Sequence, residues 1–116
     1  EAVNQDFKNC KEYYELAANL DHSEGYFLLA SLYYEGKGVQ KDYIKACEYY
    51  KKACKLGDEN SLLYLGNIYY YGGYGVEKDY VKAVKYYEMS KKYFFSEAVI
   101  NLGYIYFYGG YGIQNN

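Results

Sequence analysis

The hydrophobic residues of this chain recur at spacings of three and four, the period of an α-helix that buries one face. In the middle of the sequence they stand at Tyr43, Ala46, Tyr50 and Ala53. A short carboxylate before such a stripe can accept hydrogen bonds from the free N–H groups of the first helical turn. The aspartates that we expect to cap helices in this way are Asp6, Asp42 and Asp79.

A second helical pattern starts after Gly57, with Asp58 as its expected cap, and ends at Gly72. We expect Leu65, Ile68 and Tyr69 to face the core on this helix. The pattern is followed by a glycine-rich loop, in which Gly75 is expected to need a positive φ and Gly73 to tolerate substitution better. The apolar residues after these loops are expected to fill the seam between helix pairs, and they are Val39, Val76 and Ile113.

The whole pattern repeats along the chain. The phrase YYYGGYGVE at 69–77 returns as YFYGGYGIQ at 106–114, and a shorter form, YYEGKGVQ, stands at 33–40. Repeat rows therefore run over residues 5–40, 41–77 and 78–114, and each row reads as two helices. Because a short helix pair cannot bury its apolar face alone, stacked pairs are needed to build a continuous core. The sequence predicts an all-α fold, an α-solenoid over residues 1–116 as one domain, and a repeat phase typical of a window cut from a longer array.

These recurring positions resemble the Sel-1-like repeat, a relative of the tetratricopeptide repeat. The resemblance covers essentially the whole chain and implies a right-handed superhelix of antiparallel helix pairs. It also implies an adaptor or scaffold that holds a protein or peptide partner on the concave helix face. The residues that carry the resemblance in one copy are Leu65, Gly66, Tyr69, Gly72, Gly75, Val76, Asp79, Lys82, Ala83, Tyr86 and Tyr87.

Composition narrows the function. The chain of 116 residues has 13 cations, no arginine and a net charge of -2, with both signs mixed along the sequence. This pattern argues against nucleic-acid binding, which favours a basic face and arginine forks. No apolar run approaches the roughly 20 residues needed to span a bilayer, so we expect no membrane insertion. Compartment stays unknown, and a homo-oligomer stays possible.

The cysteines are expected to be free thiols. Cys47 and Cys54 lie seven residues apart on one predicted helix, about 10.5 Å by helical rise and too far for a disulfide. Cysteine-rich members of the family pair a cysteine at the place of Cys54 with one eight residues later, where this chain has Leu62. We expect Cys10 to be a small core residue and Cys47 and Cys54 to lie at the edge.

Enzyme chemistry finds little support in the sequence. His22 is the only histidine, and its neighbours fit turn and cap roles. The S-x-x-K motif of β-lactamase-like enzymes is absent. We expect no enzyme activity, no cofactor and no metal site.

The 21 tyrosines are the unusual feature. Most are expected in the core, but a stripe on the second helix of each row lies opposite the inward residues. Exposed tyrosines beside asparagines suit partner binding, because tyrosine offers a large rigid surface with a polar tip. The predicted partner-binding residues are Glu24, Ser31, Glu35, Tyr64, Asn67, Tyr71, Asn101, Tyr104 and Tyr108.

Two functions remain open at this point. The favoured one is a protein-interaction scaffold that binds a peptide or protein. The alternative is a secreted or periplasmic cell-envelope repeat protein with weak hydrolase or glycan-binding activity, in which the tyrosines would stack on sugars.

Overall fold

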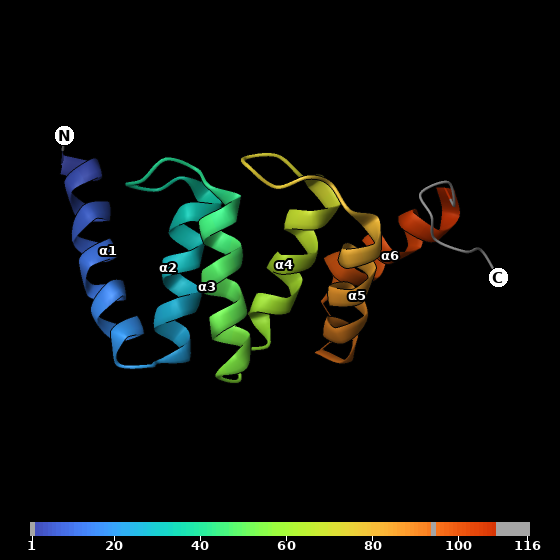
Figure 1. Cartoon of the computed structure of the whole chain (residues 1–116), viewed down its shortest axis with the longest axis horizontal. Helices are drawn as coiled ribbons and strands as arrows, with labels where there is room; N and C mark the ends of the chain where they lie inside the picture. Colours follow the sequence, from blue (N-terminus) through green and yellow to red (C-terminus); the bar gives the residue numbers. More distant parts are fainter. Residues whose placement is uncertain (1, 94, 109–116) are drawn as a thin grey trace.

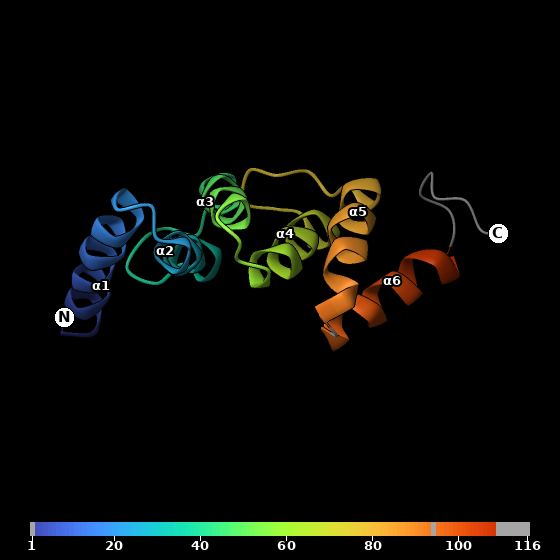
Figure 2. The same cartoon turned by 90° about the horizontal axis from the view of Figure 1, so that it is seen from below.

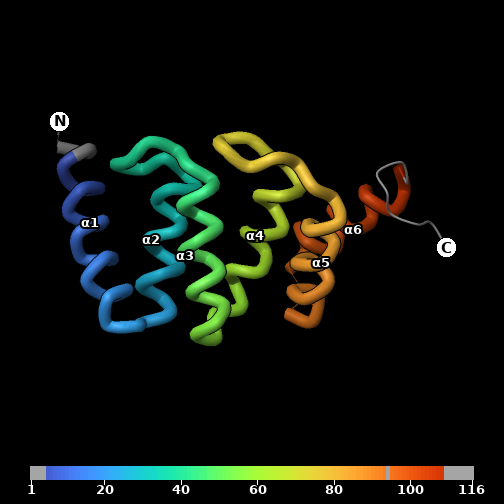
Figure 3. Tube along the Cα trace, in the orientation of Figure 1, coloured from blue at the N-terminus to red at the C-terminus, as the bar shows by residue number. Residues whose placement is uncertain are grey.

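The fold is a row of α-helices that follow one another in space as they do in sequence (Figures 1 and 3). The computed structural model describes residues 2–93 and 95–108. Among these residues the only strand-like pairing is an isolated bridge between Gly73 and Val76. The helices are α1 (Ala2–Asn19), α2 (Ser23–Glu35), α3 (Tyr43–Lys55), α4 (Asn60–Tyr71), α5 (Tyr80–Ser90), a 3-10 turn η1 (Lys91–Tyr93) and α6 (Ser96–Tyr108).

The helices form two layers along an elongated body. Seen from below, α3 lies above α2 and α4, and α5 begins on the same side as α3 and runs down toward the start of α6 (Figure 2). The principal extents are 50 × 28 × 20 Å, as expected when each pair contacts only its neighbours. This arrangement confirms the predicted all-α solenoid. None of the described helices is long and apolar enough to cross a membrane.

The predicted aspartates lie at the starts of α3, α4 and α5. Asp42 accepts hydrogen bonds from the N–H groups of Ile44 and Lys45 at 2.9 and 3.1 Å, and Asp79 accepts one from Lys82 at 3.1 Å. Asp58 accepts from both the N–H and the hydroxyl of Ser61. The predicted cap at Asp6 is wrong, because α1 already starts at Ala2 and Asp6 lies inside the helix, where the N–H groups around it bond within the helix.

The glycine loop after α4 makes the turn that the sequence predicts. Gly75 has a φ of +96°, and a Cβ atom there would lie 2.7 Å from Cδ1 of Ile44. Gly73 also has a positive φ, +101°, but its Cβ would meet nothing within 4 Å. Gly73 is thus as demanding of backbone conformation as Gly75, and differs only in its open surroundings. Val76 is half-buried against the core.

The other seam residues follow the same pattern in part. Val39 is half-buried against the core, as expected for a residue that fills the seam. Ile113 lies outside the described residues.

The core runs along the interface between the layers. Leu65 and Ile68 are fully buried and Tyr69 is nearly so, which confirms the predicted inward face of α4. Tyr50 and Tyr87, at the same place in α3 and α5, are fully buried. Small residues face large ones across the layers, so that the tyrosine rings pack directly against the backbone of the neighbouring helix.

The cysteines differ in burial from the prediction. All three thiols are free. Cys47 is buried and not at the edge, because α3 is covered by both α2 and α4. Cys54 and Cys10 are half-buried, so Cys10 is less enclosed than expected. Burial raises the pKa of Cys47, and burial, followed by the nearby Asp58 carboxylate, raises the pKa of Cys54 to about 11.

Candidate partner-binding face

The two layers carry different charges. The helices α2, α4 and α6 contain no lysine, and their only charged residues are the exposed Glu24, Glu35 and Glu97. The opposite layer holds the exposed lysines of α3, α5 and η1. These lysines are Lys45, Lys51, Lys52, Lys55, Lys82, Lys85, Lys91 and Lys92.

Among α2 to α6 and η1, lysines therefore occur only on α3, α5 and η1, whereas glutamates occur in both layers, with Glu48 on α3 and Glu88 on α5. This distribution follows from the repeat, because the lysines belong to the capped helix of each pair. Several of the lysines lie over tyrosine rings, as Lys82 does at 5.2 Å from the ring centre of Tyr69 and Lys45 at 5.6 Å from that of Tyr33. These rings belong to α2 and α4, so the lysines of α3 and α5 reach across to the neighbouring helices.

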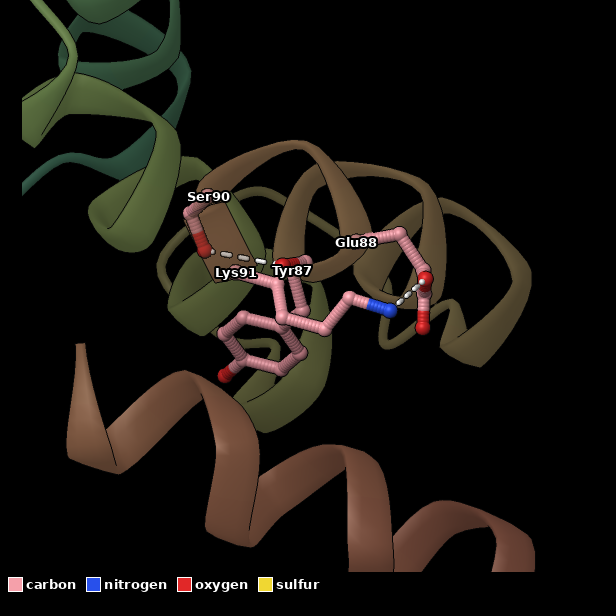
Figure 4. Close-up of polar contacts among 4 residues, drawn as sticks. All are labelled: Tyr87, Glu88, Ser90 and Lys91. Atoms are coloured by element: carbon pink, nitrogen blue, oxygen red, sulfur yellow. Dashed lines mark hydrogen bonds and ion pairs between the residues drawn. The ribbon is translucent and has the colours of Figure 1, made fainter. Parts of the chain in front are cut away.

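The buried tyrosines Tyr50 and Tyr87 make hydrogen bonds to side chains of α2, α4 and α6. The hydroxyl of Tyr87 donates to Oδ1 of Asn67 at 2.6 Å and accepts from Nδ2 of Asn101 at 3.0 Å. Figure 4 shows the Tyr87 ring pointing toward the ribbon of α6, away from the surface contact between Lys91 and Glu88. The hydroxyl of Tyr50 lies 3.0 Å from that of Ser31. Burial raises the pKa of both tyrosines above its usual range.

These bonds correct part of the predicted stripe. Asn67 is 2% and Asn101 5% exposed, so the expectation that they lie on the surface is wrong. Their amides are used inside the protein, because a tyrosine hydroxyl buried between two helices needs hydrogen-bond partners from both. Ser31 is half-buried. Its hydroxyl donates to the carbonyl of Phe27 and lies beside the hydroxyl of Tyr50.

Tyr64 belongs to an aromatic cluster and not to the free surface. Its ring stacks on Tyr50, with centres 5.4 Å apart and planes 12° apart. Tyr34 meets the same ring edge-on at 5.2 Å, and Phe27 does so at 5.7 Å. Tyr64 is therefore half-buried.

Three tyrosines of the predicted stripe are exposed, and they lie in the second and third repeat rows. Tyr71, Tyr104 and Tyr108 are 52%, 51% and 66% exposed. All three lie close enough to Tyr70 to add to the rise in its pKa, which burial dominates. The structure thus brings three of the predicted residues together around a half-buried tyrosine, and places the exposed Glu24 and Glu35 on α2.

Sequence reasoning missed Tyr34 and Tyr70 beside this face, and it placed Glu97 on the α6 stripe without counting it among the predicted binding residues. Glu97 lies near enough to Tyr34 and Tyr87 to raise their pKa values, after burial as the main cause. Its place at the start of the α6 stripe was a usable signal. Tyr34 and Tyr70 support the surface from below, and their repeat positions alone do not distinguish them from core tyrosines. No group of His, Cys, Asp and Glu in the described part of the chain could hold a metal ion.

The comparison with known families decides the identity of the repeat. The family model described as Sel1 repeat matches residues 1–22, 23–58, 60–92 and 96–116. The chain belongs to the Sel1 repeat family. The second, third and fourth matched units begin at the first residues of α2, α4 and α6. No curated protein matches the sequence.

Solved structures agree with this assignment. A protective antigen of uropathogenic Escherichia coli strains that displays an SLR fold is 27% identical, with a TM-score of 0.81. A Sel1 repeat protein from Oxalobacter formigenes is also 27% identical, with a TM-score of 0.74. Cysteine rich protein B of Helicobacter pylori is 37% identical, with a TM-score of 0.64.

The shared region is most of this chain but only part of the similar proteins. It covers 91%, 91% and 77% of this chain, and 22%, 42% and 66% of the three others in the same order. Sel1 repeat proteins are commonly scaffolds for protein interactions and are generally not enzymes. This general role is the function that the family assignment supports.

Proposed function

We propose that this Sel1 repeat protein is a scaffold that binds a protein segment along the layer of α2, α4 and α6. The observation that carries the proposal is that α2, α4 and α6 lack lysine and that α4 and α6 expose tyrosines of the predicted stripe. The helices of this layer carry glutamates without any lysine, and they present Tyr71, Tyr104 and Tyr108 together. Rigid tyrosines beside uncompensated carboxylates favour a partner with apolar and cationic side chains.

The positions of these tyrosines and glutamates suggest how a bound segment would be oriented along the layer. The exposed tyrosines lie toward α6, whereas Glu24 and Glu35 lie on α2. A segment with an aromatic or apolar anchor near one end and a lysine or arginine near the other fits this order. Asn67 and Asn101 act from below, by holding Tyr87 and with it the spacing of the helices.

The test is a selection from a random peptide library, followed by binding measurements on the enriched sequences. We expect enrichment of peptides that combine an aromatic residue with lysine or arginine. Tyr71→Ala and Tyr104→Ala should each weaken their binding by roughly 1 to 3 kcal/mol without loss of helicity, as is usual for interface tyrosines. The matched control is Tyr93→Ala, an exposed tyrosine on η1, which should leave binding unchanged.

The contribution of charge is tested in the same assay. Glu35→Gln should weaken binding and lower its salt dependence, because it removes a carboxylate from the proposed face. Glu48→Gln on α3 removes a carboxylate that is also exposed, from the other layer, and should have little effect. Equal effects of the two substitutions, or enrichment of acidic peptides, would contradict the proposal. No contact among the described residues favours the alternative of a cell-envelope protein.

A further inference from the structure

A stacked pair of tyrosines joins the two layers twice, and the charges around the two copies differ. In the first tyrosine pair, Tyr33 of α2 stacks on Tyr49 of α3 with ring centres 6.0 Å apart. In the second, Tyr69 of α4 stacks on Tyr86 of α5 at 5.9 Å. The two pairs occupy the same positions of the repeat, and each has further described helices on both sides of it. They therefore form a comparison inside one chain.

Charges of both signs surround the first tyrosine pair. Burial is the main cause that raises the pKa of Tyr49, and Glu15 and Glu48 add to the rise. Lys45 acts against it and lies 5.6 Å from the ring centre of Tyr33. The fold thus accepts two carboxylates beside this pair.

The corresponding positions around the second tyrosine pair all hold lysine. Lys51 and Lys82 lie 6.0 and 5.2 Å from the ring centre of Tyr69, and the Lys51 ammonium donates to the Tyr69 hydroxyl at 3.5 Å. Lys85 lies 5.4 Å from the ring centre of Tyr86. These three residues, here called the lysine cluster, stand in the register places of Glu15, Lys45 and Glu48.

The charge of the lysine cluster is not balanced by ion pairs. Within the described residues, none of its members forms a salt bridge with a carboxylate. Asp79 lies near enough to add to the raised pKa of Tyr69, after burial and Cys47, but its carboxylate caps α5 by accepting the N–H of Lys82. Like charges around one ring pair repel each other, and the first pair shows that the stack forms without them.

The geometry favours a compact anion as the group that offsets this repulsion. An ammonium group is a compact point charge that binds phosphate well, whereas arginine forks match carboxylates. A phosphate monoester carries about two negative charges at neutral pH and several strong acceptor oxygens. Glu48 and Glu88 each stand about one helical turn from a lysine of the cluster. They interrupt the cationic surface along both helices, which argues against a long polyanion.

We propose that the lysine cluster binds a phosphorylated side chain of a partner protein, with the phosphate group between Lys51, Lys82 and Lys85. All three side chains are exposed, so the cluster is a surface site and does not enclose a small molecule as a ligand pocket does. A phosphate carried on a protein segment adds contacts on either side of the site. Its residues are separate from those of the proposed partner-binding face, so either site can fail without the other.

The probe is a pool of fluorescent peptides with a fixed central phosphoserine between random positions. Fluorescence anisotropy measures its binding to the whole chain, and pools with serine or glutamate at the centre are the references. The phosphoserine pool should bind about tenfold more tightly than either reference, because charge-assisted hydrogen bonds to phosphate are lost in both. Tyr71→Ala, on the other face, should leave this binding unchanged.

A matched pair of variants locates the site. Lys51→Glu restores the charge of the first tyrosine pair and should weaken binding of the phosphoserine pool by about tenfold or more. Lys52→Glu makes the same change at the next residue, whose ammonium lies 5.6 Å from the ring centre of Tyr26 on α2. It should weaken binding by roughly twofold or less, because salt screens exposed charges at a distance. Circular dichroism should show both variants folded.

A further variant tests whether the charges are sufficient. Glu15→Lys combined with Glu48→Lys gives the first tyrosine pair the lysines of the second. In isothermal titration calorimetry with an enriched phosphopeptide, this variant should show an additional binding site. An unchanged stoichiometry would contradict the proposal, because lysines around the ring pair would then not create a site.

Three other results would overturn it. Equal weakening by Lys51→Glu and Lys52→Glu would indicate general attraction between charges. A glutamate pool that binds as tightly as the phosphoserine pool would assign the cluster to acidic segments. Competition by inorganic phosphate alone at the concentration of the peptides would assign it to a free anion.

Discussion

The pairs α2–α3 and α4–α5 solve the same packing problem with different polar chemistry. Each buries a tyrosine of the capped helix completely, Tyr50 in one and Tyr87 in the other. Tyr50 is held by the hydroxyl of Ser31 and by stacking on Tyr64. Tyr87 instead lies in a chain of hydrogen bonds from Asn101 to its hydroxyl and on to Asn67.

The difference shows which part of the repeat is structural and which is free to vary. The ring occupies the same space in both pairs, because the layers must be filled at that point. The hydroxyl needs a partner once it is buried, but serine and asparagine serve equally well. The stacked Tyr64 and the bonded Asn101 occupy corresponding places in the register. The repeat thus conserves volume within the chain and lets the polar partner change.

The largest expected effect comes from removing the rings. Tyr50→Ala and Tyr87→Ala should each lower the free energy of unfolding by about 3 to 5 kcal/mol, because each leaves a cavity between the layers. Urea denaturation followed by circular dichroism measures this. Similar losses at the two sites are expected from their equal burial. Stability unchanged in either variant would show that the two pairs do not share this packing.

Removing only the hydroxyls should separate the two pairs. Tyr87→Phe leaves the Asn67 and Asn101 amides buried without this partner, which costs about 1 to 3 kcal/mol. Tyr50→Phe leaves Ser31 with its bond to the Phe27 carbonyl, so the loss should be about 0.5 to 1.5 kcal/mol. Thermal unfolding of both variants tests the order. A double-mutant cycle with Asn101→Ala then isolates the coupling to Tyr87, which should be absent for Tyr50.

The loops after α2 and α4 provide a smaller contrast. A Cβ atom on Gly38 would lie 2.5 Å from Cβ of Phe7, close to rigid backbone, whereas on Gly75 it would meet the end of the Ile44 side chain. Gly38→Ala and Gly75→Ala should each cost about 1 to 3 kcal/mol because of their positive φ, with Gly38 the more costly. Gly73→Ala, which carries backbone strain alone, is the control. Melting temperatures in the reverse order would show that the loop contacts do not limit substitution.

The smallest effect on stability is expected at Cys47, a thiol on α3 that has no counterpart on α5. Val84 occupies the place of Cys47 in the repeat register, so Cys47→Val should change the free energy of unfolding by about 1 kcal/mol or less. Reductant should leave the melting temperature unchanged, since the thiols are free. Alkylation of Cys54 should be slow near pH 8, because its pKa is raised to about 11. Rapid modification there would indicate that the α3 end opens readily.

Much of this architecture follows from local rules that the sequence displays. The stripe from Leu65 to Tyr69 predicted the buried face of α4, and Asp42 and Asp79 predicted two helix starts. These features depend on residues within one or two turns of each other, so helix period and capping chemistry suffice. Asp6 failed because a helix start also depends on what precedes the cap, and α1 extends to Ala2.

The candidate site was predicted only in part. The exposure of Tyr71, Tyr104 and Tyr108 follows from helix period, since these residues lie away from the inward stripe. The burial of Asn67 and Asn101 does not, because a helix in this fold is contacted from two sides and the period marks only one of them. Binding by this face remains a prediction that the peptide experiments test.

The sequence by itself determined the repeat, the helices, the glycine turns and the membership in the Sel1 repeat family, all of which rest on neighbours along the chain. The tertiary structure alone decided which polar residues are used inside and how charge is shared between the layers. Asn67 meets Tyr87 across 20 residues, and Lys82 of α5 comes to lie over the ring of Tyr69 of α4 only after the helices stack. The angle between helices sets these distances, and that angle is fixed by side-chain packing throughout the row.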